Sequence, residues 1–148
     1  MKKKLYAGIL VSLVSFILML TVMLRPSEFV ILSTNDMHAS LDNVARLATA
    51  VEECRDTVFT IVVDAGDRWT GNAYVDLAEG RLPMIRLMNA VGYDIAIPGN
   101  HEFDYGMDRF LELTKVANFP YISANFNKEG ELVFKPYVIK EFDGVKIA

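Results

Sequence analysis

The stretch Ile95-Ala96-Ile97-Pro98-Gly99-Asn100-His101-Glu102-Phe103-Asp104 passes from a short apolar run into a turn that carries an amide, an imidazole and carboxylates. An apolar run that ends in polar residues is typical of a buried β-strand and its exit. The same order occurs twice earlier, where residues 29–33 precede Asp36 and His38, and residues 58–63 precede Asp67. The chain contains two histidines. Each therefore falls where the end of a strand would present it.

Helical patterns separate these strands. Asp42 or Asn43 can cap a helix in which apolar residues recur every three or four positions over residues 44–51. A second helical region has Pro83 at or near its first turn. Alternating strands and helices predict an α/β fold with a mostly parallel sheet, in which functional groups gather beyond the carboxyl ends of the strands.

The pattern changes in the last third of the chain. A helix capped by Asp108 is predicted over residues 109–116, and a fourth strand over residues 121–124. The segments after it have the pattern of antiparallel ribbon strands and turns: strands at residues 132–134 and 137–142, turns at residues 127–130 and 143–144, and a last strand that begins at Val145. The alternation of strands and helices therefore ends before the C-terminal segment.

The N-terminal segment is a separate unit. Residues 5–24 carry no charge and lie between the lysines at residues 2–4 and Arg25. At about 1.5 Å per residue, a helix of this length spans the hydrocarbon core of a bilayer, and its basic flank favours the cytoplasmic side. The run is longer than a typical signal-peptide core and lacks an Ala-x-Ala-like cleavage site, which favours an uncleaved signal anchor over a cleaved peptide. We expect residues 1–25 to be a signal anchor or signal peptide that delivers residues 26–148 to the periplasm or cell surface.

Residues 26–148 have the length of one domain. With the four basic residues of the N-terminal segment set aside, 11 of the 15 basic residues remain against 19 acidic residues. This negative balance argues against a nucleic-acid polymer as a partner and against bulk-charge binding to anionic membranes. Cys54 is the single cysteine and cannot form an internal disulfide, and its surroundings indicate a partly buried helix position.

The polar groups at the predicted strand ends suit divalent cations. Asp36 and His38 are two residues apart, so on an extended backbone their side chains point the same way and can bind one cation. Asp67 follows a glycine and offers a carboxylate that could bridge two cations, and Asn100 offers an amide oxygen. Oxygen and imidazole donors suit Mn²⁺, Zn²⁺, Fe²⁺ or Mg²⁺ without selecting one of them. Two such ions could activate water and neutralise phosphoryl oxygens.

His101 has a different candidate role. Asp104 lies three residues later, and its carboxylate can hydrogen-bond one nitrogen of the imidazole, which fixes the tautomer and favours the imidazolium. The other nitrogen can then face a leaving-group oxygen. We therefore expect His101 to be a general acid or a transition-state stabiliser, with Asp104 as the residue that orients it.

The neighbours of these residues are expected to have structural roles. Asp64 is expected to cap the exit of its strand, and Arg68 to form a surface ion pair rather than to meet phosphate. Glu102 is expected to be solvated or to accept a hydrogen bond behind the site. The nearby aromatic residues are more typical of packing than of a platform for stacking bases: Trp69, Tyr74, Phe103, Tyr105 and Phe110.

Four ordered motifs resemble those of one known family: Asn35-Asp36-Met37-His38, Asp64-Ala65-Gly66-Asp67, Gly99-Asn100-His101-Glu102-Phe103-Asp104-Tyr105-Gly106 and Ser123-Ala124-Asn125. Together they resemble the N-terminal part of bacterial and animal 5′-nucleotidases, within the calcineurin-like metallophosphoesterases. The resemblance covers nearly everything from Val30 onward. It implies the N-terminal portion of a layered αββα sandwich, a periplasmic or cell-surface setting, two divalent metal ions, and nucleotides or related phosphoesters as substrates.

The resemblance also implies a role for each candidate residue: Asp36 and His38 as ligands of a first metal, Asp67 as a bridging carboxylate, Asn100 as a ligand of a second metal, and His101 with Asp104 as a catalytic dyad. One position departs from the motif, because Ala39 stands where the family usually has glycine. We expect this change to be tolerated if the backbone angle at Ala39 allows it.

No histidine follows His101, although the family's later histidines complete both metal sites and its C-terminal domain binds the nucleotide. We therefore expect the chain to hold about half of a dinuclear site, with one sheet face uncovered and the strand from Val145 unpaired. Two interpretations follow. The chain is either an N-terminal piece of a 5′-nucleotidase-like phosphoesterase that needs sequence downstream, or a membrane-tethered, catalytically incomplete remnant or metal-binding module.

Overall fold

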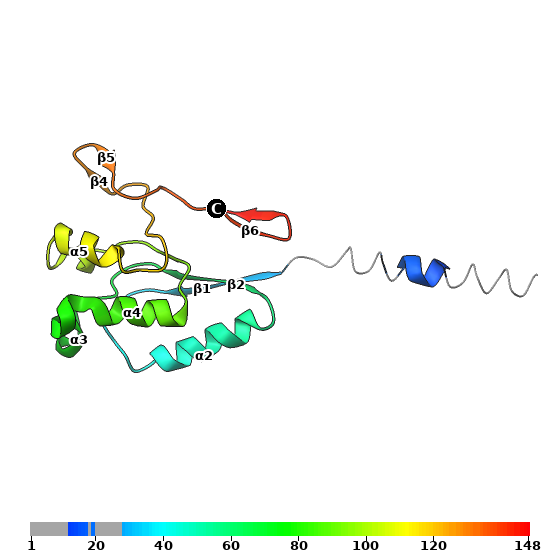
Figure 1. Ribbon diagram of the computed structural model, residues 1–148, viewed down its shortest axis with the longest axis horizontal. Coiled ribbons are helices and arrows are strands. Elements are labelled where there is room, and N and C mark those ends of the chain that lie inside the picture. The colour runs from blue at the N-terminus through cyan, green and yellow to red at the C-terminus, as the bar shows by residue number, and fades with distance from the viewer. Residues whose placement is uncertain (1–11, 18, 20–27) are drawn as a thin grey trace, which may run out of the picture.

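The computed structural model describes residues 12–17, 19 and 28–148 (Figure 1). Residues 12–17 are helical, and most of the predicted anchor, residues 5–24, lies outside the described residues. Within the part of the chain that is described, no helix is both long and apolar enough to cross a membrane. The signal anchor or signal peptide therefore stays a prediction.

Three parallel strands form the sheet that positions the site: β1 (Phe29–Thr34), β2 (Phe59–Asp64) and β3 (Ile95–Ala96), in the order β1-β2-β3. The pairing is in register at the carboxyl ends, where Asp64 stands opposite Thr34 on one side and opposite Ala96 on the other. All three strands therefore end at the same edge of the sheet. This arrangement confirms the predicted α/β fold with a mostly parallel sheet.

The predicted fourth strand at residues 121–124 is present only as two isolated parallel bridges. Tyr121 pairs with Ala96, and Ile122 pairs with Lys135. The Ala96 carbonyl accepts the Ile122 N–H at 2.9 Å. The segment thus runs beside β3 for too short a distance to form a regular ladder.

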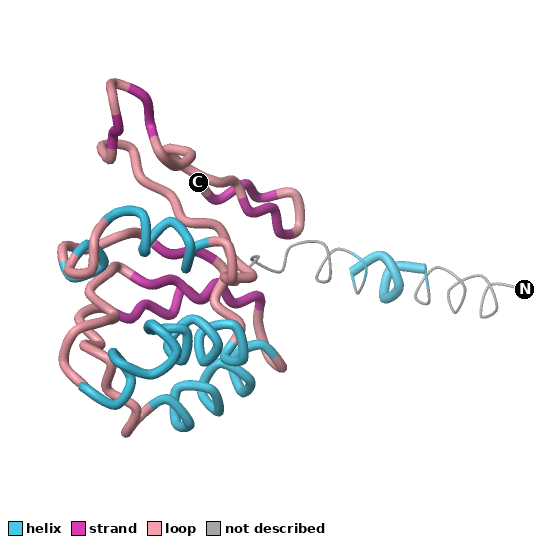
Figure 2. Tube along the Cα trace, turned by 60° about the vertical axis from the view of Figure 1, so that its left-hand side comes forward, coloured by secondary structure: helices cyan, strands magenta, loops and turns pink. Residues whose placement is uncertain are grey.

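Helices connect the strands: α2 (Val44–Arg55), α3 (Ala73–Leu77), the 3-10 helix η1 (Ala78–Arg81), α4 (Leu82–Val91), the 3-10 helix η2 (His101–Phe103) and α5 (Met107–Thr114). Figures 1 and 2 show α2 and α4 together on one face of the sheet. Their apolar sides supply Val51, Met84 and Met88 to the core, as the three-to-four spacing predicts. Cys54 is half-buried in α2, as predicted.

The helix ends follow the sequence signals in part. Pro83 lies in the first turn of α4, as predicted, and Gly92 ends that helix in a left-handed conformation with φ +85°. α2 begins after Asn43, whose side chain makes no capping hydrogen bond. α5 begins after Gly106, because the backbone of that glycine turns the chain at φ +87°. The predicted cap at Asp108 is therefore wrong, and this residue lies in the first turn of α5.

Two short antiparallel hairpins form the C-terminal segment: β4 (Asn127–Lys128) with β5 (Glu131–Leu132), and β6 (Lys140–Phe142) with β7 (Val145–Ile147). Each closes through two residues with positive φ, Glu129-Gly130 and Asp143-Gly144, as tight hairpin turns require. The predicted strands at residues 132–134 and 137–142 are therefore shorter and shifted. The expectation of an unpaired strand from Val145 is wrong, because this strand pairs with β6.

The sheet face opposite α2 and α4 carries isoleucines and is only partly covered. The β6–β7 hairpin lies on this side (Figure 1), and an apolar groove of about 260 Å³ has Ile31, Ile61 and Ile147 in its lining. Ile31 remains 51% exposed. As expected, the described residues do not close this face of the sheet.

Candidate metal centre

Hydrogen bonds between the loops after β1, β2 and β3 bring the predicted site residues to one edge of the sheet. The Asp36 N–H donates to the Gly66 carbonyl at 3.1 Å. The His38 N–H donates to the Asp67 carbonyl at 3.0 Å. The third loop joins them because the His101 N–H donates to Asp67 Oδ1 at 2.9 Å. The loop after β2 therefore holds the other two in place.

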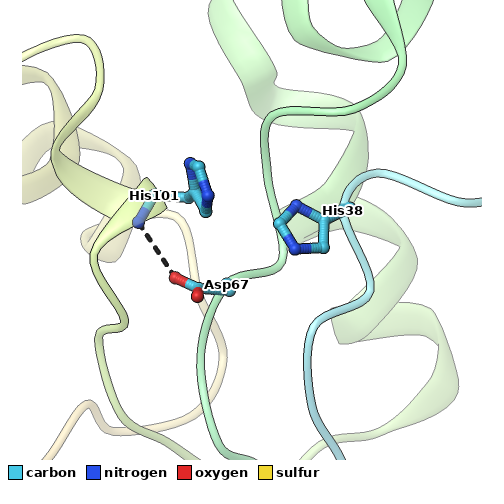
Figure 3. A group of neighbouring side chains, drawn as sticks. All are labelled: His38, Asp67 and His101. Atoms are coloured by element: carbon cyan, nitrogen blue, oxygen red, sulfur yellow. Dashed lines mark hydrogen bonds between the residues drawn. The ribbon is translucent and has the colours of Figure 1, made fainter.

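His38, Asp67 and His101 form a cluster that can hold a metal ion (Figure 3). One ligand atom from each residue lies within 4.8 Å of those of the other two. The two imidazole rings meet edge to face, with centroids 4.9 Å apart. Three protein ligands plus water form a common metal site. His101 is thereby also a candidate ligand, as an alternative to the acid role expected from the sequence, because a metal-bound ring nitrogen has no proton to donate.

A hydrogen bond from Nδ1 of His38 leaves the other ring nitrogen, Nε2, available as a ligand atom. Nδ1 lies 2.9 Å from the Thr70 carbonyl oxygen, which can only accept, so Nδ1 carries the proton and Nε2 of the neutral imidazole keeps its lone pair. Nε2 lies 3.5 Å from Asp36 Oδ1, and the two atoms can share one cation. The expected extended backbone is wrong, because Asp36 and His38 have φ of +51° and +46°. Their side chains converge nonetheless.

Asn100 lies beside the cluster, directly before His101 in the chain. It is exposed and precedes η2, but its side chain makes no capping hydrogen bond to that helix. The amide oxygen is therefore available as a ligand. The four predicted metal-binding residues thus lie at one edge: His38 and Asp67 belong to the three-residue cluster, Asp36 lies outside it but contacts His38, and Asn100 directly precedes its third member, His101.

His101 and Asp104 form the expected pair. His101 Nδ1 lies 2.8 Å from Asp104 Oδ2, and the Thr70 hydroxyl donates to the same oxygen at 2.6 Å. The hydrogen bond with Asp104 raises the pKa of the His101 imidazole above its ordinary value. The hydrogen bonds from Thr70 and His101 lower the pKa of the Asp104 carboxyl. The pair therefore favours an imidazolium beside a carboxylate, which is the state that a general acid needs.

Two glycines allow the loops after β2 and β3 to approach. A Cβ atom on Gly99 would lie 2.2 Å from Asp67 Oδ1. A Cβ atom on Gly66, which has φ +101°, would lie 2.6 Å from the Gly99 nitrogen. Real Cβ atoms do not approach this closely, so both positions need glycine for the Asp67 carboxylate to reach the third loop.

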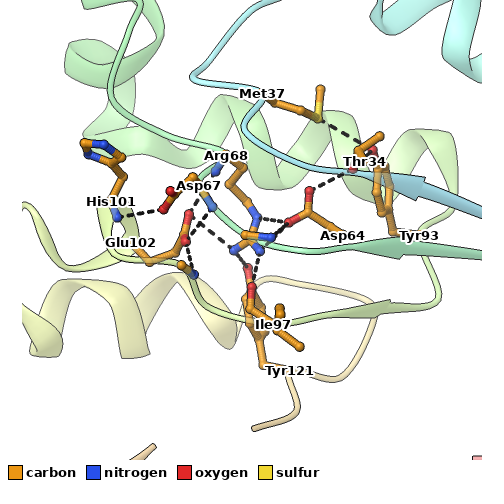
Figure 4. A network of polar contacts seen from close by, with 12 residues as sticks. Thr34, Met37, Asp64, Asp67, Arg68, Tyr93, Ile97, His101, Glu102 and Tyr121 are labelled. Carbon is orange, nitrogen blue, oxygen red and sulfur yellow. Dashed lines mark hydrogen bonds and ion pairs between the residues drawn. The ribbon is translucent and has the colours of Figure 1, made fainter.

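A buried group of charged residues supports the site from behind (Figure 4). Glu102 is 2% exposed, and its carboxylate accepts the backbone N–H groups of Asp67 at 2.9 Å and Arg68 at 3.0 Å. It also accepts the Gly99 N–H. Arg68 is fully buried and donates through Nε to Asp64 Oδ1 at 3.0 Å. The predictions of a solvated Glu102 and of a surface ion pair for Arg68 are wrong, whereas the alternative that Glu102 accepts hydrogen bonds is confirmed.

Arg68 keeps its charge in this buried group. Asp64 caps the exit of β2 as predicted, because its Oδ1 also accepts the Gly66 N–H at 3.0 Å. Burial alone would lower the pKa of Arg68. The combined influence of Tyr121, Asp64 and Glu102 is larger and opposite, so the pKa of Arg68 is raised above its ordinary value. Burial also raises the pKa of Tyr121, whose hydroxyl accepts from Arg68 Nη1 at 3.1 Å. The opposite charges of Asp64 and Arg68, four residues apart across a glycine turn, were a sequence signal for this pair.

The aromatic residues near the site divide into two groups. Trp69 and Phe110 are buried, and Phe103 packs edge to face against Phe110, with centroids 5.3 Å apart. The packing prediction is confirmed for these three. Tyr74 is 91% exposed and Tyr105 is 54% exposed. For Tyr74 the packing prediction is therefore wrong, because α3 turns its side chain to solvent.

Comparison with known proteins agrees with this geometry. The family description "calcineurin-like phosphoesterase" matches residues 29–146. A 5′-nucleotidase of Bos taurus is 37% identical over 130 residues, which cover 75% of this chain and 22% of the bovine protein. This chain therefore spans less than a quarter of that relative.

Solved structures show the same fold. The calcineurin-like phosphoesterase YfkN from Bacillus subtilis superposes with a TM-score of 0.65 at 32% identity, over 79% of this chain and 44% of YfkN. The NAD nucleotidase NadN from Haemophilus influenzae superposes with a TM-score of 0.67 at 29% identity, over 78% of this chain and 24% of NadN. With the family match across the domain, these likenesses confirm the resemblance drawn from the four motifs. The chain belongs to the calcineurin-like phosphoesterase family.

Proposed function

We propose that this chain supplies the N-terminal half of a dinuclear metal site in a phosphoester hydrolase that acts on nucleotides. The observation that carries the proposal is the cluster of His38, Asp67 and His101, with ligand atoms within 4.8 Å of one another. Asp36 and Asn100 border this cluster and add a carboxylate and an amide oxygen, and one oxygen of Asp36 also accepts the Asn35 side-chain amide. Imidazole, carboxylate and amide donors without thiolate suit Mn²⁺, Zn²⁺, Mg²⁺ or Fe²⁺. The residues therefore fit divalent cations.

Each side chain has a role in this proposal. Asp36 and His38 would hold one cation, Asp67 would bridge two, and Asn100 would hold the second. When bound, divalent ions supply Lewis acidity and a nucleophilic water for in-line displacement at phosphorus. The four side chains offer fewer donors than two ions need, since each ion takes about four to six. We therefore propose that this chain alone is insufficient for turnover.

His101 would act on the leaving group. Hydrolysis of a nucleoside monophosphate breaks the bond between phosphorus and the 5′ oxygen, and that oxygen must gain a proton. The His101 imidazolium, oriented by the Asp104 carboxylate at 2.8 Å, can donate this proton. The products are a nucleoside and phosphate. The relatives named 5′-nucleotidase and NAD nucleotidase support nucleotides as the substrate class.

The setting that we propose is outside the cytoplasm. Residues 5–24 form an uncharged run that would anchor the domain to a membrane or direct its secretion. A second candidate function is that of a tethered metal-binding module without turnover. The same three-residue cluster supports it, because three protein ligands and water already satisfy one cation.

Metal and phosphate binding to the full chain tests the proposal. We expect Mn²⁺ to bind in isothermal titration calorimetry, and Asp67→Asn to weaken binding by about tenfold or more. Asp143→Asn, in the exposed turn between β6 and β7, is the matched control. Absence of binding by the wild-type chain would overturn both candidate functions.

Inorganic phosphate separates the two candidates. A hydrolase site should bind phosphate when Mn²⁺ is present and not in its absence. A metal-binding module should bind Mn²⁺ but should not bind phosphate under either condition. Release of phosphate from adenosine monophosphate, with Mn²⁺, Mg²⁺ or Zn²⁺, should be little or none. Robust turnover that is lost in His101→Ala would support the hydrolase and contradict the proposed insufficiency of this chain.

A further inference from the structure

Thr70 is hydrogen-bonded to the imidazole of His38 and to the carboxylate of Asp104, which holds His101. Its carbonyl oxygen lies 2.9 Å from Nδ1 of His38. Its hydroxyl donates to Asp104 Oδ2 at 2.6 Å, and that oxygen lies 2.8 Å from Nδ1 of His101. One residue, in the loop between β2 and α3, is therefore bonded to one imidazole directly and to the other through a carboxylate.

The backbone of Thr70 is unusual for its residue type. Its φ is +66°, in the left-handed region that β-branched residues rarely adopt. Such a conformation persists only where the surroundings over-determine it, and it is found most often at functional sites. Glycine would adopt the same angle without strain. A threonine at this position therefore indicates that its hydroxyl is used.

Asp76 holds the Thr70 peptide in the required direction. Its two carboxylate oxygens accept the backbone N–H groups of Thr70 and Gly71, each at 3.0 Å, and its side chain is largely buried in α3. The carbonyl of Thr70 and the N–H of Gly71 belong to one planar trans peptide and point in opposite directions. Because Asp76 holds that N–H, the carbonyl is directed toward His38.

The polarity of the hydroxyl contacts is also determined. Arg81 is 2% exposed, and its Nη2 lies 3.3 Å from Thr70 Oγ1. Guanidinium nitrogens only donate, so the hydroxyl oxygen accepts from Arg81 and its proton goes to Asp104. His101 Nδ1–H then donates to the same carboxylate oxygen. Each hydrogen bond in the series Arg81–Thr70–Asp104–His101 therefore has a defined donor and a defined acceptor.

We propose that Thr70 is a positioning residue for both histidines, with its carbonyl fixing the tautomer of His38 and its hydroxyl holding Asp104 against His101. Both rings would thereby keep the proton on Nδ1 and leave Nε2 free. The catalytic meaning of this arrangement rests on the proposed function, but the arrangement itself does not depend on metal or substrate. It can therefore fail or hold independently of hydrolysis.

The test reads the tautomer of each histidine directly. The full chain, labelled with isotopes in histidine only, contains two imidazoles, and long-range nitrogen–proton correlation spectra distinguish their tautomers. Spectra of the metal-free protein would be recorded at about pH 9, well above the ordinary imidazole pKa. His38→Gln assigns the two sets of signals. We expect both rings of the wild-type chain in the single Nδ1–H form.

The variants separate the hydroxyl from the carbonyl. In Thr70→Val, we expect His101 to lose its single tautomer while His38 keeps it, because the backbone carbonyl remains. Thr70→Ser should restore the wild-type pattern. Thr70→Gly should behave like Thr70→Val for His101 while relieving the backbone strain, which separates positioning from folding. Thr49→Val, which removes a hydroxyl bonded within α2 to the Ala45 carbonyl, is the control.

Two results would overturn the proposal. One is an unchanged His101 pattern in both Thr70→Val and Thr70→Gly, which would mean that Asp104 alone sets the tautomer. The other is a loss in Thr70→Ser as large as that in Thr70→Val, which would mean that the hydroxyl is not the group responsible. Because no metal or substrate is present, neither result could come from failure of the proposed function.

Discussion

Glu102 and Asp67 hold each other's loops through reciprocal hydrogen bonds. The Asp67 N–H donates to Glu102 Oε2 at 2.9 Å, while the Asp67 carboxylate accepts the N–H of His101, the residue before Glu102, also at 2.9 Å. The exits of β2 and β3 are thus joined by two bonds of opposite direction (Figure 4). Asp67, a predicted metal ligand, is thereby positioned by the carboxylate of Glu102, whose side chain is shielded from solvent.

Glu102→Gln should destabilise the fold. The amide removes the charge that lies 3.7 Å from Arg68 Nη1 and replaces one acceptor with a donor that faces backbone N–H groups. Breaking a buried charge pair from one side costs about 3–5 kcal/mol. We expect the free energy of unfolding to fall by about this amount in urea denaturation followed by circular dichroism.

An exposed glutamate provides the control for that measurement. Glu112 is 61% exposed at its side chain and pairs with Arg109 at 2.8 Å on the surface of α5. Glu112→Gln should change the free energy of unfolding by no more than about 0.5 kcal/mol. Equal effects of the two substitutions would contradict the supporting role assigned to Glu102.

Gly99→Ala should weaken metal binding. The added Cβ atom would lie 2.2 Å from Asp67 Oδ1, so the carboxylate must leave its position beside the His101 N–H. Displacement of a ligand from its hydrogen-bonded support costs about 10- to 100-fold in metal affinity. Calorimetric titration with Mn²⁺ measures the loss. Gly144→Asn, at an open hairpin position with φ +77° that asparagine tolerates, should bind Mn²⁺ like the wild-type chain.

The site was predictable from the sequence where its contacts are local. Asp104 lies three residues after His101, so that their hydrogen bond follows from one turn of chain. His38 and Asp67 follow apolar runs that form parallel strands, and parallel strands end at a common edge. The periodicity and spacing of the sequence were therefore enough to predict both the pairing of His101 with Asp104 and the common edge of His38 and Asp67.

The supporting residues were not predictable because their partners are distant in the chain. Glu102 accepts the N–H groups of Asp67 and Arg68, which lie 35 and 34 positions earlier in the chain. The Thr70 carbonyl accepts from His38, which lies 32 positions earlier. Such contacts depend on how closely the loops approach. The left-handed backbone at Asp36 and His38 depends on the same approach, since those residues hydrogen-bond to the loop after β2.

The pKa of His101 should fall when Asp104 is neutralised. The hydrogen bond with Asp104 raises that pKa, so Asp104→Asn should return it toward about 6.5. A pH titration of the His101 signals by nuclear magnetic resonance measures the shift, with Asp143→Asn as the control. The same midpoint in the wild-type chain and in Asp104→Asn would contradict the assigned pairing.

The sign of the linked stability effect follows from the two shifts. The raised pKa of His101 adds stability that is complete below its unfolded value and is lost as the pH rises through the folded value. The lowered pKa of Asp104 adds stability that is present above its unfolded value and is lost as the pH falls through the folded value. The stability difference between the wild-type chain and Asp104→Asn should therefore be largest between about pH 4 and pH 6.5.

Substitutions at Ala39 test how the chain tolerates the departure from the family motif. Ala39 is fully buried with φ +56°, and the left-handed region costs an L-residue about 1–2 kcal/mol. Ala39→Gly relieves this strain but loses a buried methyl group, worth about 0.8 kcal/mol. The glycine also raises the conformational entropy of the unfolded chain, which destabilises the fold by about 0.4–1 kcal/mol. These effects nearly cancel, so urea denaturation should show a change within about 1 kcal/mol. Ala39→Val adds branching and volume at the same angle and should destabilise by about 2 kcal/mol or more; similar results for valine and glycine would contradict a left-handed, close-packed position.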